Sequence, residues 1–221
     1  CLLASDGLAQ NAKPVLAVLN KSDSNLALVD PMTMKVTPKI PVGDSPHEVV
    51  FSTDGKLAFV ANYGAQTPGS TISVIDVAAA KELRRVDLAP LMRPHGLQFV
   101  GGKLYFTAET NRIIARYDPT TNKVDWMMGT GQNSSHMIAV SSDQKRMVTA
   151  NIGSDSVTIF DFQNTPPAPS KITHIAVGKQ PEAVDLSPDG KEVWTGLNAE
   201  GMVEIVDVAQ GKSVAKLNIG G

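Results

Sequence analysis

The sequence predicts an all-β fold made of repeated four-stranded antiparallel sheets, and three observations support this prediction. A mostly apolar segment ending in aspartate recurs at intervals of 42 to 46 residues, at Asp30, Asp76, Asp118, Asp161 and Asp207. A tight turn such as Asp54-Gly55 or Gly101-Gly102 recurs within the units, and these dipeptides favour hairpins because they accept the positive φ angles that hairpin turns need. No apolar pattern of helical period and useful length appears.

Each complete unit contains four predicted strands. In the second unit they cover His47–Ser52, Leu57–Ala61, Thr71–Ile75 and Leu83–Asp87. Four strands in ~40–45 residues, repeated in tandem, indicate the blades of a β-propeller. A single blade cannot bury both faces of its sheet, so neighbouring blades must stack around a common axis.

The units divide the chain into segments of similar length. The first unit has three predicted strands and lacks the innermost one, so about five blades are present. The remaining residues, 1–13, form a signal-peptide remnant or an N-terminal tail. The predicted blades cover 14–43, 44–91, 92–131, 132–178 and 179–221.

Composition and charge limit the partners. Hydrophobic residues make up 42% of the 221 residues and charged residues 19%, and the formal net charge is −2. These values are ordinary for a globular protein and give no electrostatic footprint for nucleic acid. No apolar stretch approaches the ~20 residues that a membrane-spanning helix needs, so we expect no transmembrane segment.

The first residues resemble the end of a secretory signal. Cys1-Leu2-Leu3-Ala4 is apolar, and Gly7-Leu8-Ala9 places small residues before a potential cut, so that the mature chain begins near Gln10. We therefore expect a periplasmic or extracellular protein. Two alternatives remain: Cys1 is the acylated first residue of a lipoprotein, although the upstream residues that identify one are not in the sequence, or the chain starts at an arbitrary point.

Several segments together resemble the YVTN-type β-propeller repeat over residues 14 to 220. They include Phe59-Val60-Ala61-Asn62, Ser73-Val74-Ile75-Asp76, Pro181-Glu182-Ala183-Val184 and Ser187-Pro188-Asp189-Gly190-Lys191. Lactonase-like propellers are similar. The resemblance implies an exported protein and a ring of seven blades, of which this chain would be a part; a compact ring of five blades is the alternative. An unclosed array would expose apolar blade faces and should associate with a partner, bend shut or be fragile.

Two sets of side chains are expected to meet around one end of the central channel. The first set opens the innermost strands: His47, His95, His136 and Glu182. The second set ends the next strand, six residues after the turn lysine of each unit: Asn62, Glu109, Asn151 and Leu197. In the first unit, the interval counted back from Asp30 gives Asn20.

Imidazole, carboxylate and carboxamide groups can bind a divalent cation or polarise a carbonyl group. On this basis His47, His95 and His136 are candidate metal ligands, and His95 and Glu109 are candidate catalytic residues. Asn20, Asn62, Asn151 and Glu182 are candidate ligand-binding residues. No cofactor is certain, and a divalent metal ion is the one that this donor set would accept. The alternative is structural: polar residues at both positions hydrogen-bond the strand ends.

Two functions remain open. The first is an exported binding or scaffold propeller whose channel mouth receives a small molecule, a metal ion or a protein segment. The second is a lactonase-like hydrolase or lyase that uses a histidine/glutamate site at the same mouth. An enzyme would turn over lactones and lose that activity in His95→Ala or Glu109→Gln protein, whereas a scaffold would not.

Overall fold

The computed structural model describes residues 14–164 and 168–220. Two segments lie outside the described residues. One is 1–13, the expected signal remnant or tail, which includes the possible acylation site Cys1. The other includes Pro166 and Pro167. No helix among the described residues is long and apolar enough to cross a bilayer.

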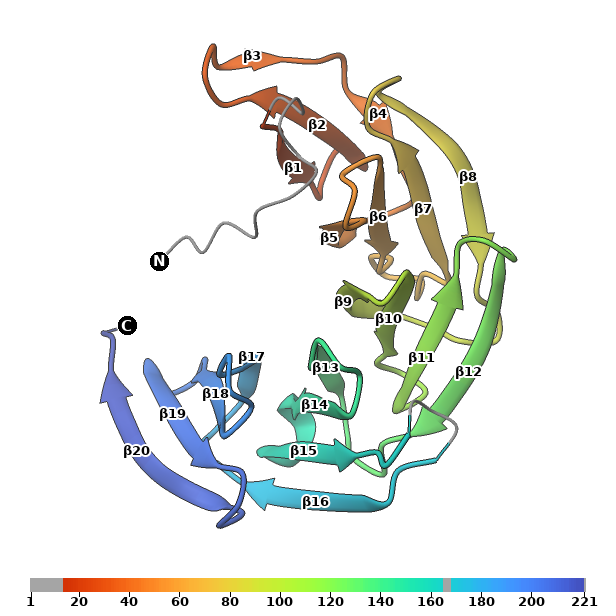
Figure 1. Cartoon of the computed structure of the whole chain (residues 1–221). Coiled ribbons are helices and arrows are strands. Elements are labelled where there is room, and N and C mark those ends of the chain that lie inside the picture. Colours follow the sequence, from red (N-terminus) through yellow and green to blue (C-terminus); the bar gives the residue numbers. More distant parts are fainter. Residues whose placement is uncertain (1–13, 165–167, 221) are drawn as a thin grey trace.

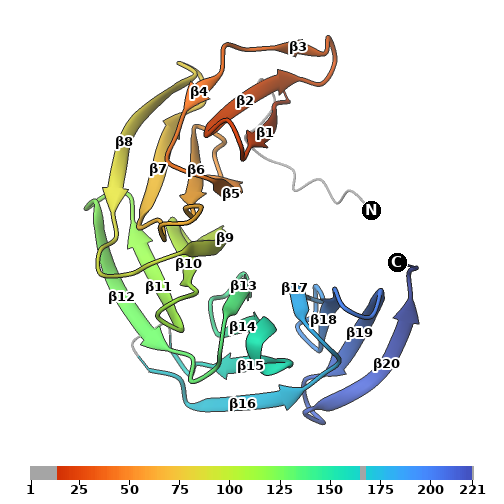
Figure 2. The same ribbon diagram turned by 180° about the vertical axis from the view of Figure 1, so that it is seen from behind.

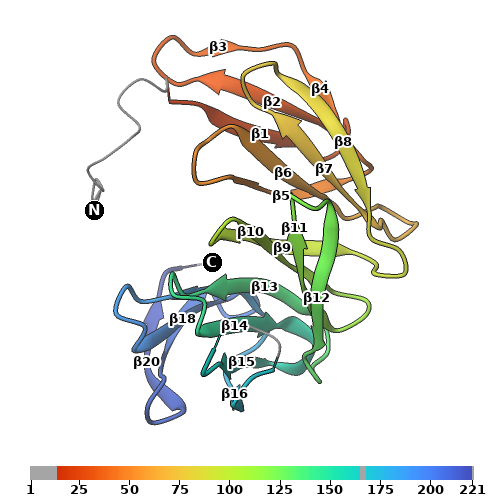
Figure 3. The same ribbon diagram turned by 45° about the vertical axis from the view of Figure 1, so that its right-hand side comes forward.

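Five antiparallel sheets stand side by side around a common centre and form an open arc (Figures 1 and 2). Turning the molecule shows that successive sheets stack with a progressive twist (Figure 3). The predicted fold class, an all-β propeller of four-stranded antiparallel blades, is confirmed. The sheets do not close on one another, so the compact ring of five blades considered as an alternative is not formed.

We number the blades in chain order, from the innermost strand outward. Blade 1 consists of β1 (Leu16–Asn20), β2 (Asn25–Asp30) and an outer strand in two pieces, β3 (Lys35–Val36) and β4 (Ile40–Pro41). Among the described residues it has no innermost strand, as the sequence predicts. Blade 2 consists of β5 (Pro46–Phe51), β6 (Leu57–Asn62), β7 (Thr71–Asp76) and β8 (Lys81–Asp87).

The remaining blades repeat the same order. Blade 3 has β9 (Pro94–Val100), β10 (Lys103–Ala108), β11 (Ile113–Asp118) and β12 (Lys123–Gly129). Blade 4 has β13 (Ser135–Val140), β14 (Arg146–Asn151), a 3-10 turn η1 (Ile152–Ser154), β15 (Ser156–Asp161) and β16 (Lys171–Ala176). Blade 5 has β17 (Pro181–Leu186), β18 (Glu192–Leu197), β19 (Met202–Asp207) and β20 (Lys212–Asn218).

The hairpin after each inner strand follows from local turn chemistry. In blade 2 the Asp54 carboxylate accepts hydrogen bonds from the Ser52 hydroxyl at 2.7 Å and from the Lys56 amide at 3.1 Å. Gly55 adopts a φ of 69°, which glycine accepts without a steric penalty. The same Ser-x-Asp arrangement recurs in blades 4 and 5 around Asp143 and Asp189.

The hydrophobic core lies between blades rather than in one central layer. Four clusters of buried side chains fill the four interfaces between successive blades. Phe59 and Phe106, for example, join blades 2 and 3, and both are fully buried. This packing fixes each blade relative to the next, and it therefore also fixes the ends of the inner strands relative to one another.

Candidate functional site

A β-bulge recurs at the start of all four inner strands and positions the second residue of each. In blade 2, Pro46 pairs with Asn62 and Glu48 with Ala61, so His47 is the extra residue. The same shift occurs at His95, His136 and Glu182. The residue before each strand has a positive φ: Ser45, Arg93, Ser134 and Gln180. Bulges of this kind turn a side chain out of the regular ladder.

The bulges bring these four side chains into one row. The ring centroids of His47 and His95 are 5.0 Å apart, and those of His95 and His136 are 3.7 Å apart. The row continues to Glu182, whose Oε1 is 3.8 Å from His136 Nε2. The structure therefore places together three histidines and one glutamate from four different blades.

A second row comes from the residue that follows the second strand of each blade. Lys21 Nζ is 3.0 Å from His47 Nε2, the Tyr63 ring is 5.3 Å from the His95 ring, and Glu109 Oε2 is 3.8 Å from His136 Nδ1. Each of these residues thus contacts the row member of the next blade. We call Lys21, Tyr63 and Glu109, together with His47, His95, His136 and Glu182, the channel mouth.

The structure corrects the position that the sequence gives to Glu109. The strand pairing places Ala108, not Glu109, opposite Pro94, where Asn62 and Asn151 lie opposite Pro46 and Ser135. In blade 3 the second strand begins at the turn lysine itself, since Lys103 pairs with Val100, whereas in blades 2, 4 and 5 it begins one residue after that lysine. Counting from the turn lysine consequently overshoots by one residue, and Glu109 is the counterpart of Tyr63.

His47 has no free ring nitrogen. Lysine can only donate a hydrogen bond, so the contact with Lys21 makes Nε2 of His47 an acceptor. The proton then sits on Nδ1 and is donated to the Ser45 carbonyl at 3.0 Å. This tautomer leaves His47 neutral and occupied by protein partners on both sides.

His95 and His136 differ from His47 in this respect. His95 is only 5% exposed and His136 only 8%. The Nδ1 atoms of both rings are buried and have no hydrogen-bond partner among the described residues. Buried polar atoms are rarely left unpaired in native proteins. These two nitrogens are therefore the unsatisfied part of the channel mouth.

Burial keeps His47 and His95 uncharged. Burial, assisted by the neighbouring His136 and His47, lowers the pKa of His95 to about 3. Burial also lowers the pKa of His47. Because the ordinary histidine value is near 6.5, both rings are neutral at physiological pH, with one donor and one acceptor nitrogen each.

Glu109 provides a negative charge beside the histidines. Burial by itself raises the pKa of Glu109, but the His136 imidazole and the Tyr63 hydroxyl outweigh that effect and lower the pKa. The Tyr63 hydroxyl donates a hydrogen bond of 2.6 Å to Glu109 Oε2. Burial and this bond raise the pKa of Tyr63 to about 12, and the Arg93 guanidinium lies 4.5 Å from the centre of its ring.

The three candidate asparagines bond within the blades. Asn62 is 1% exposed; its carboxamide accepts from the Gly43 amide and donates to Thr71 and Ser73. Asn151 is fully buried and bonds to Ser135, Thr149, Ser156 and Thr158. Asn20 donates to Asn25. These bonds tie strand ends together, and we do not include the asparagines in the channel mouth.

The donor geometry bears on the predicted metal site. No group of three or more histidine, cysteine, aspartate or glutamate side chains in 14–164 and 168–220 is arranged to hold a metal ion. The rings of His95 and His136 are tilted by 34° relative to each other, with their centroids 3.7 Å apart.

Sequence reasoning missed Lys21, Tyr63 and Arg93. Lys21 and Tyr63 each lie one residue after the end of a strand, outside the polar positions of the repeat. The residue type at this position differs in chemistry from blade to blade. The sequence signal that could have found Lys21 and Tyr63 is that they directly follow Asn20 and Asn62.

Fold and site together define a β-propeller with a polar channel mouth assembled from successive blades. The chain belongs to the YNCE-like β-propeller family, whose model matches residues 3–139. A second family model, the seven-bladed lactonase β-propeller, matches residues 113–217. No curated protein sequence matches the chain.

Solved structures share the fold. A hydrazine synthase structure from Kuenenia stuttgartiensis has a TM-score of 0.62 at 16% identity, over 92% of this chain and 83% of that one. A functionally unknown protein from Desulfotomaculum acetoxidans has a TM-score of 0.72 at 16% identity, over 90% of this chain and 65% of that one. At this identity the likeness shows the fold alone.

Proposed function

We propose that the chain is an exported, non-enzymatic binding propeller that receives a ligand at the channel mouth. The observation that carries the proposal is a pair of Nδ1 atoms, on His95 and His136, that form no hydrogen bond with any described residue. In the same site His47, Tyr63 and Glu109 already have hydrogen-bond partners. A ligand or a bridging water that reaches these nitrogens would satisfy them. Export is part of the proposal and rests on the apolar and small residues of Cys1–Ala9.

The charges favour binding over catalysis. A general base works best when its pKa lies near the operating pH, but the pKa values of His95 and Glu109 are both lowered. Glu109 is also held by Tyr63. A site with the neutral His95 ring and the Glu109 carboxylate can recognise a ligand by hydrogen bonds without transferring a proton.

A lactonase-like hydrolase or lyase is the second candidate, because a lactonase model matches 113–217. His95 and Glu109, the residues that would act, both lie outside that matched segment. This match therefore supports the shared fold, and of the channel mouth it covers only His136 and Glu182.

The test uses protein with ¹⁵N-labelled histidine and a panel of lactones, amines, carboxylates, short peptides and Zn²⁺. We expect at least one compound to shift the His95 and His136 signals, without lactone turnover. His95→Ala should abolish that binding, whereas His174→Ala, in β16 and outside the channel mouth, should leave it unchanged. Lactone turnover that disappears in Glu109→Gln protein would establish the enzyme instead.

A further inference from the structure

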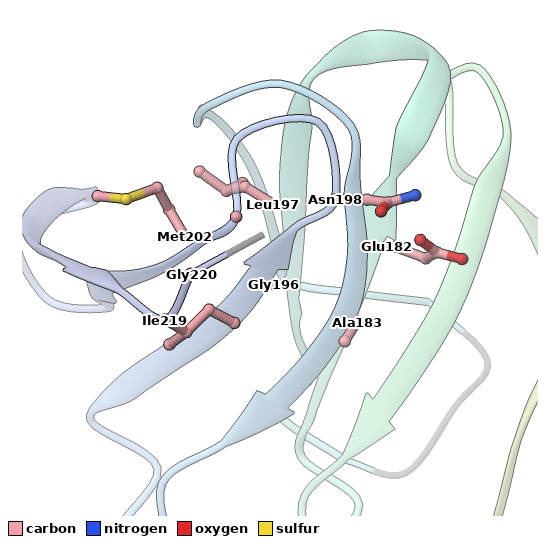
Figure 4. Close-up of a pocket in the computed structure, with 9 residues that line it drawn as sticks. Glu182, Ala183, Gly196, Leu197, Asn198, Met202, Ile219 and Gly220 are labelled. Carbon is pink, nitrogen blue, oxygen red and sulfur yellow. The ribbon is translucent and has the colours of Figure 1, made fainter.

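A hollow of about 330 Å³ lies on blade 5 beside the channel mouth (Figure 4). Its wall is mostly apolar, with Ala183, Leu197, Met202 and Ile219. Leu197 is buried, whereas Ile219 is 65% exposed. Hydrocarbon placed on this surface would remove the exposed Ile219 side chain from water, which is favourable.

The rim of the hollow is polar on one side only. Figure 4 shows Glu182 and Asn198 on the same side, across from Met202 and Ile219. The Asn198 amide donates to the Gln180 carbonyl at 3.0 Å, which fixes the backbone at this rim. The hollow therefore combines an apolar wall with a localised pair of oxygen acceptors, as small-molecule sites usually do.

Glu182 is a carboxylate that forms no ion pair with a lysine or arginine of the described residues. Its Oε1 lies 3.8 Å from His136 Nε2. The other carboxylates of this part of blade 5 are engaged: Glu200 and Glu204 both contact Lys216, and Glu204 accepts the Gly178 amide. Glu182 is also nearly half exposed, so a ligand can reach it.

We propose that this hollow binds a small aliphatic amine, with the ammonium group on Glu182 and the Asn198 carboxamide oxygen, and the hydrocarbon on Leu197, Met202 and Ile219. The inference deepens the proposed function and rests on it, because Glu182 belongs to the channel mouth. An ammonium group supplies the positive charge that Glu182 lacks and three hydrogen-bond donors. The negative charge of Glu109, on the other side of His136, adds to the attraction.

The experiment compares four probes with the same protein by NMR titration: n-butylammonium, n-butanol, butyrate and methylammonium. We expect n-butylammonium to bind, at a millimolar dissociation constant typical of so small a ligand. n-Butanol and methylammonium should each bind at least about tenfold more weakly, since one lacks the charge and the other the hydrocarbon. Butyrate should not bind. The signals of Met202 and Ile219 should shift with n-butylammonium.

Variants locate the site. Glu182→Gln should weaken n-butylammonium binding at least about tenfold. Glu192→Gln is the matched control, because Glu192 begins β18 and the hollow lies at the other end of that strand; it should bind as the wild type does. Equal binding of n-butanol and n-butylammonium, or an unchanged affinity in Glu182→Gln protein, would overturn the inference.

The two proposals fail differently. If another panel compound shifts the His95 and His136 signals while n-butylammonium leaves Met202 and Ile219 unchanged, the amine is wrong and the binding propeller stands. If sedimentation shows that a second copy of the chain covers this face and n-butylammonium does not bind, the amine is also wrong.

Discussion

Single residues set the state of the channel mouth through their hydrogen-bond partners. His47 is saturated by Lys21 and Ser45, whereas the Nδ1 atoms of His95 and His136 form no hydrogen bond within 14–164 and 168–220. Three histidines that look equivalent in the sequence therefore differ in chemistry. The repeat predicts their common position, but the difference depends on Lys21, which belongs to another blade.

Acid should destabilise the protein in part through His95. Its pKa is about 3 in the folded chain and near 6.5 when unfolded, so between these values the unfolded chain binds a proton that the folded chain excludes. Stability from this residue is complete above about pH 6.5 and falls as the pH drops toward 3. The residue accounts for a loss on the order of 2–4 kcal/mol between pH 7 and pH 4.

Urea unfolding of wild type and His95→Gln at both pH values measures this loss. Neighbouring groups that titrate in the same range, including His47 and Glu109, remain in both proteins, so the difference between the two isolates His95. The wild type should lose more stability on acidification than the variant. Parallel losses in the two proteins would show that His95 is not held neutral.

At the scale of single elements, the close approach of inner strands fixes the row of histidines. A Cβ on Gly96 in β9 would lie 2.7 Å from the His136 carbonyl and from Met137 Cα in β13. Both are backbone atoms, so they cannot swing away. Gly96 therefore allows blades 3 and 4 to bring His95 and His136 together.

Gly96→Ala should separate β9 from β13 and cost about 1–3 kcal/mol of stability through overpacking. Gly129→Ala is the matched control, because a Cβ on Gly129 meets no other atom within 4 Å; its stability should be unchanged or slightly raised. Thermal unfolding of both variants measures the effect. Equal stability of the two variants would show that β9 and β13 are far enough apart to accommodate the added methyl group.

The elements also show what the sequence could predict. Strand number, order and hairpins follow from repeated Asp-Gly turns and apolar runs, which are local signals. The place of Glu109 does not follow, because the shorter hairpin at Gly101–Gly102 shifts the register by one residue and the turn lysine is only an indirect marker. Contacts such as Tyr63 with Glu109 join residues 46 positions apart, so only the packing of blades 2 and 3 reveals them.

At the scale of the whole molecule, stability should be graded along the arc. The second strands of blades 2, 3 and 4 are almost entirely buried, whereas β17 of blade 5 and β1 of blade 1 are largely exposed or intermediate. In repeat proteins each unit is stabilised by its neighbours, and a terminal blade of this arc has one neighbour instead of two.

Amide hydrogen exchange measures this gradient. Protection should be greatest in β6, β10 and β14 and lowest in β1 and β17, because local opening requires less free energy where less apolar surface is buried. Uniform protection across all five blades would contradict the graded picture and indicate that the terminal blades are as well packed as the central ones.

The central claim is that bulged inner strands of successive blades place their second residues in one row. Nuclear Overhauser spectroscopy on histidine-labelled protein tests it directly. The account predicts cross-peaks between the rings of His47 and His95 and, more strongly, between those of His95 and His136, with none from His174 to any of them. Absence of the His95–His136 cross-peak in folded protein would contradict it.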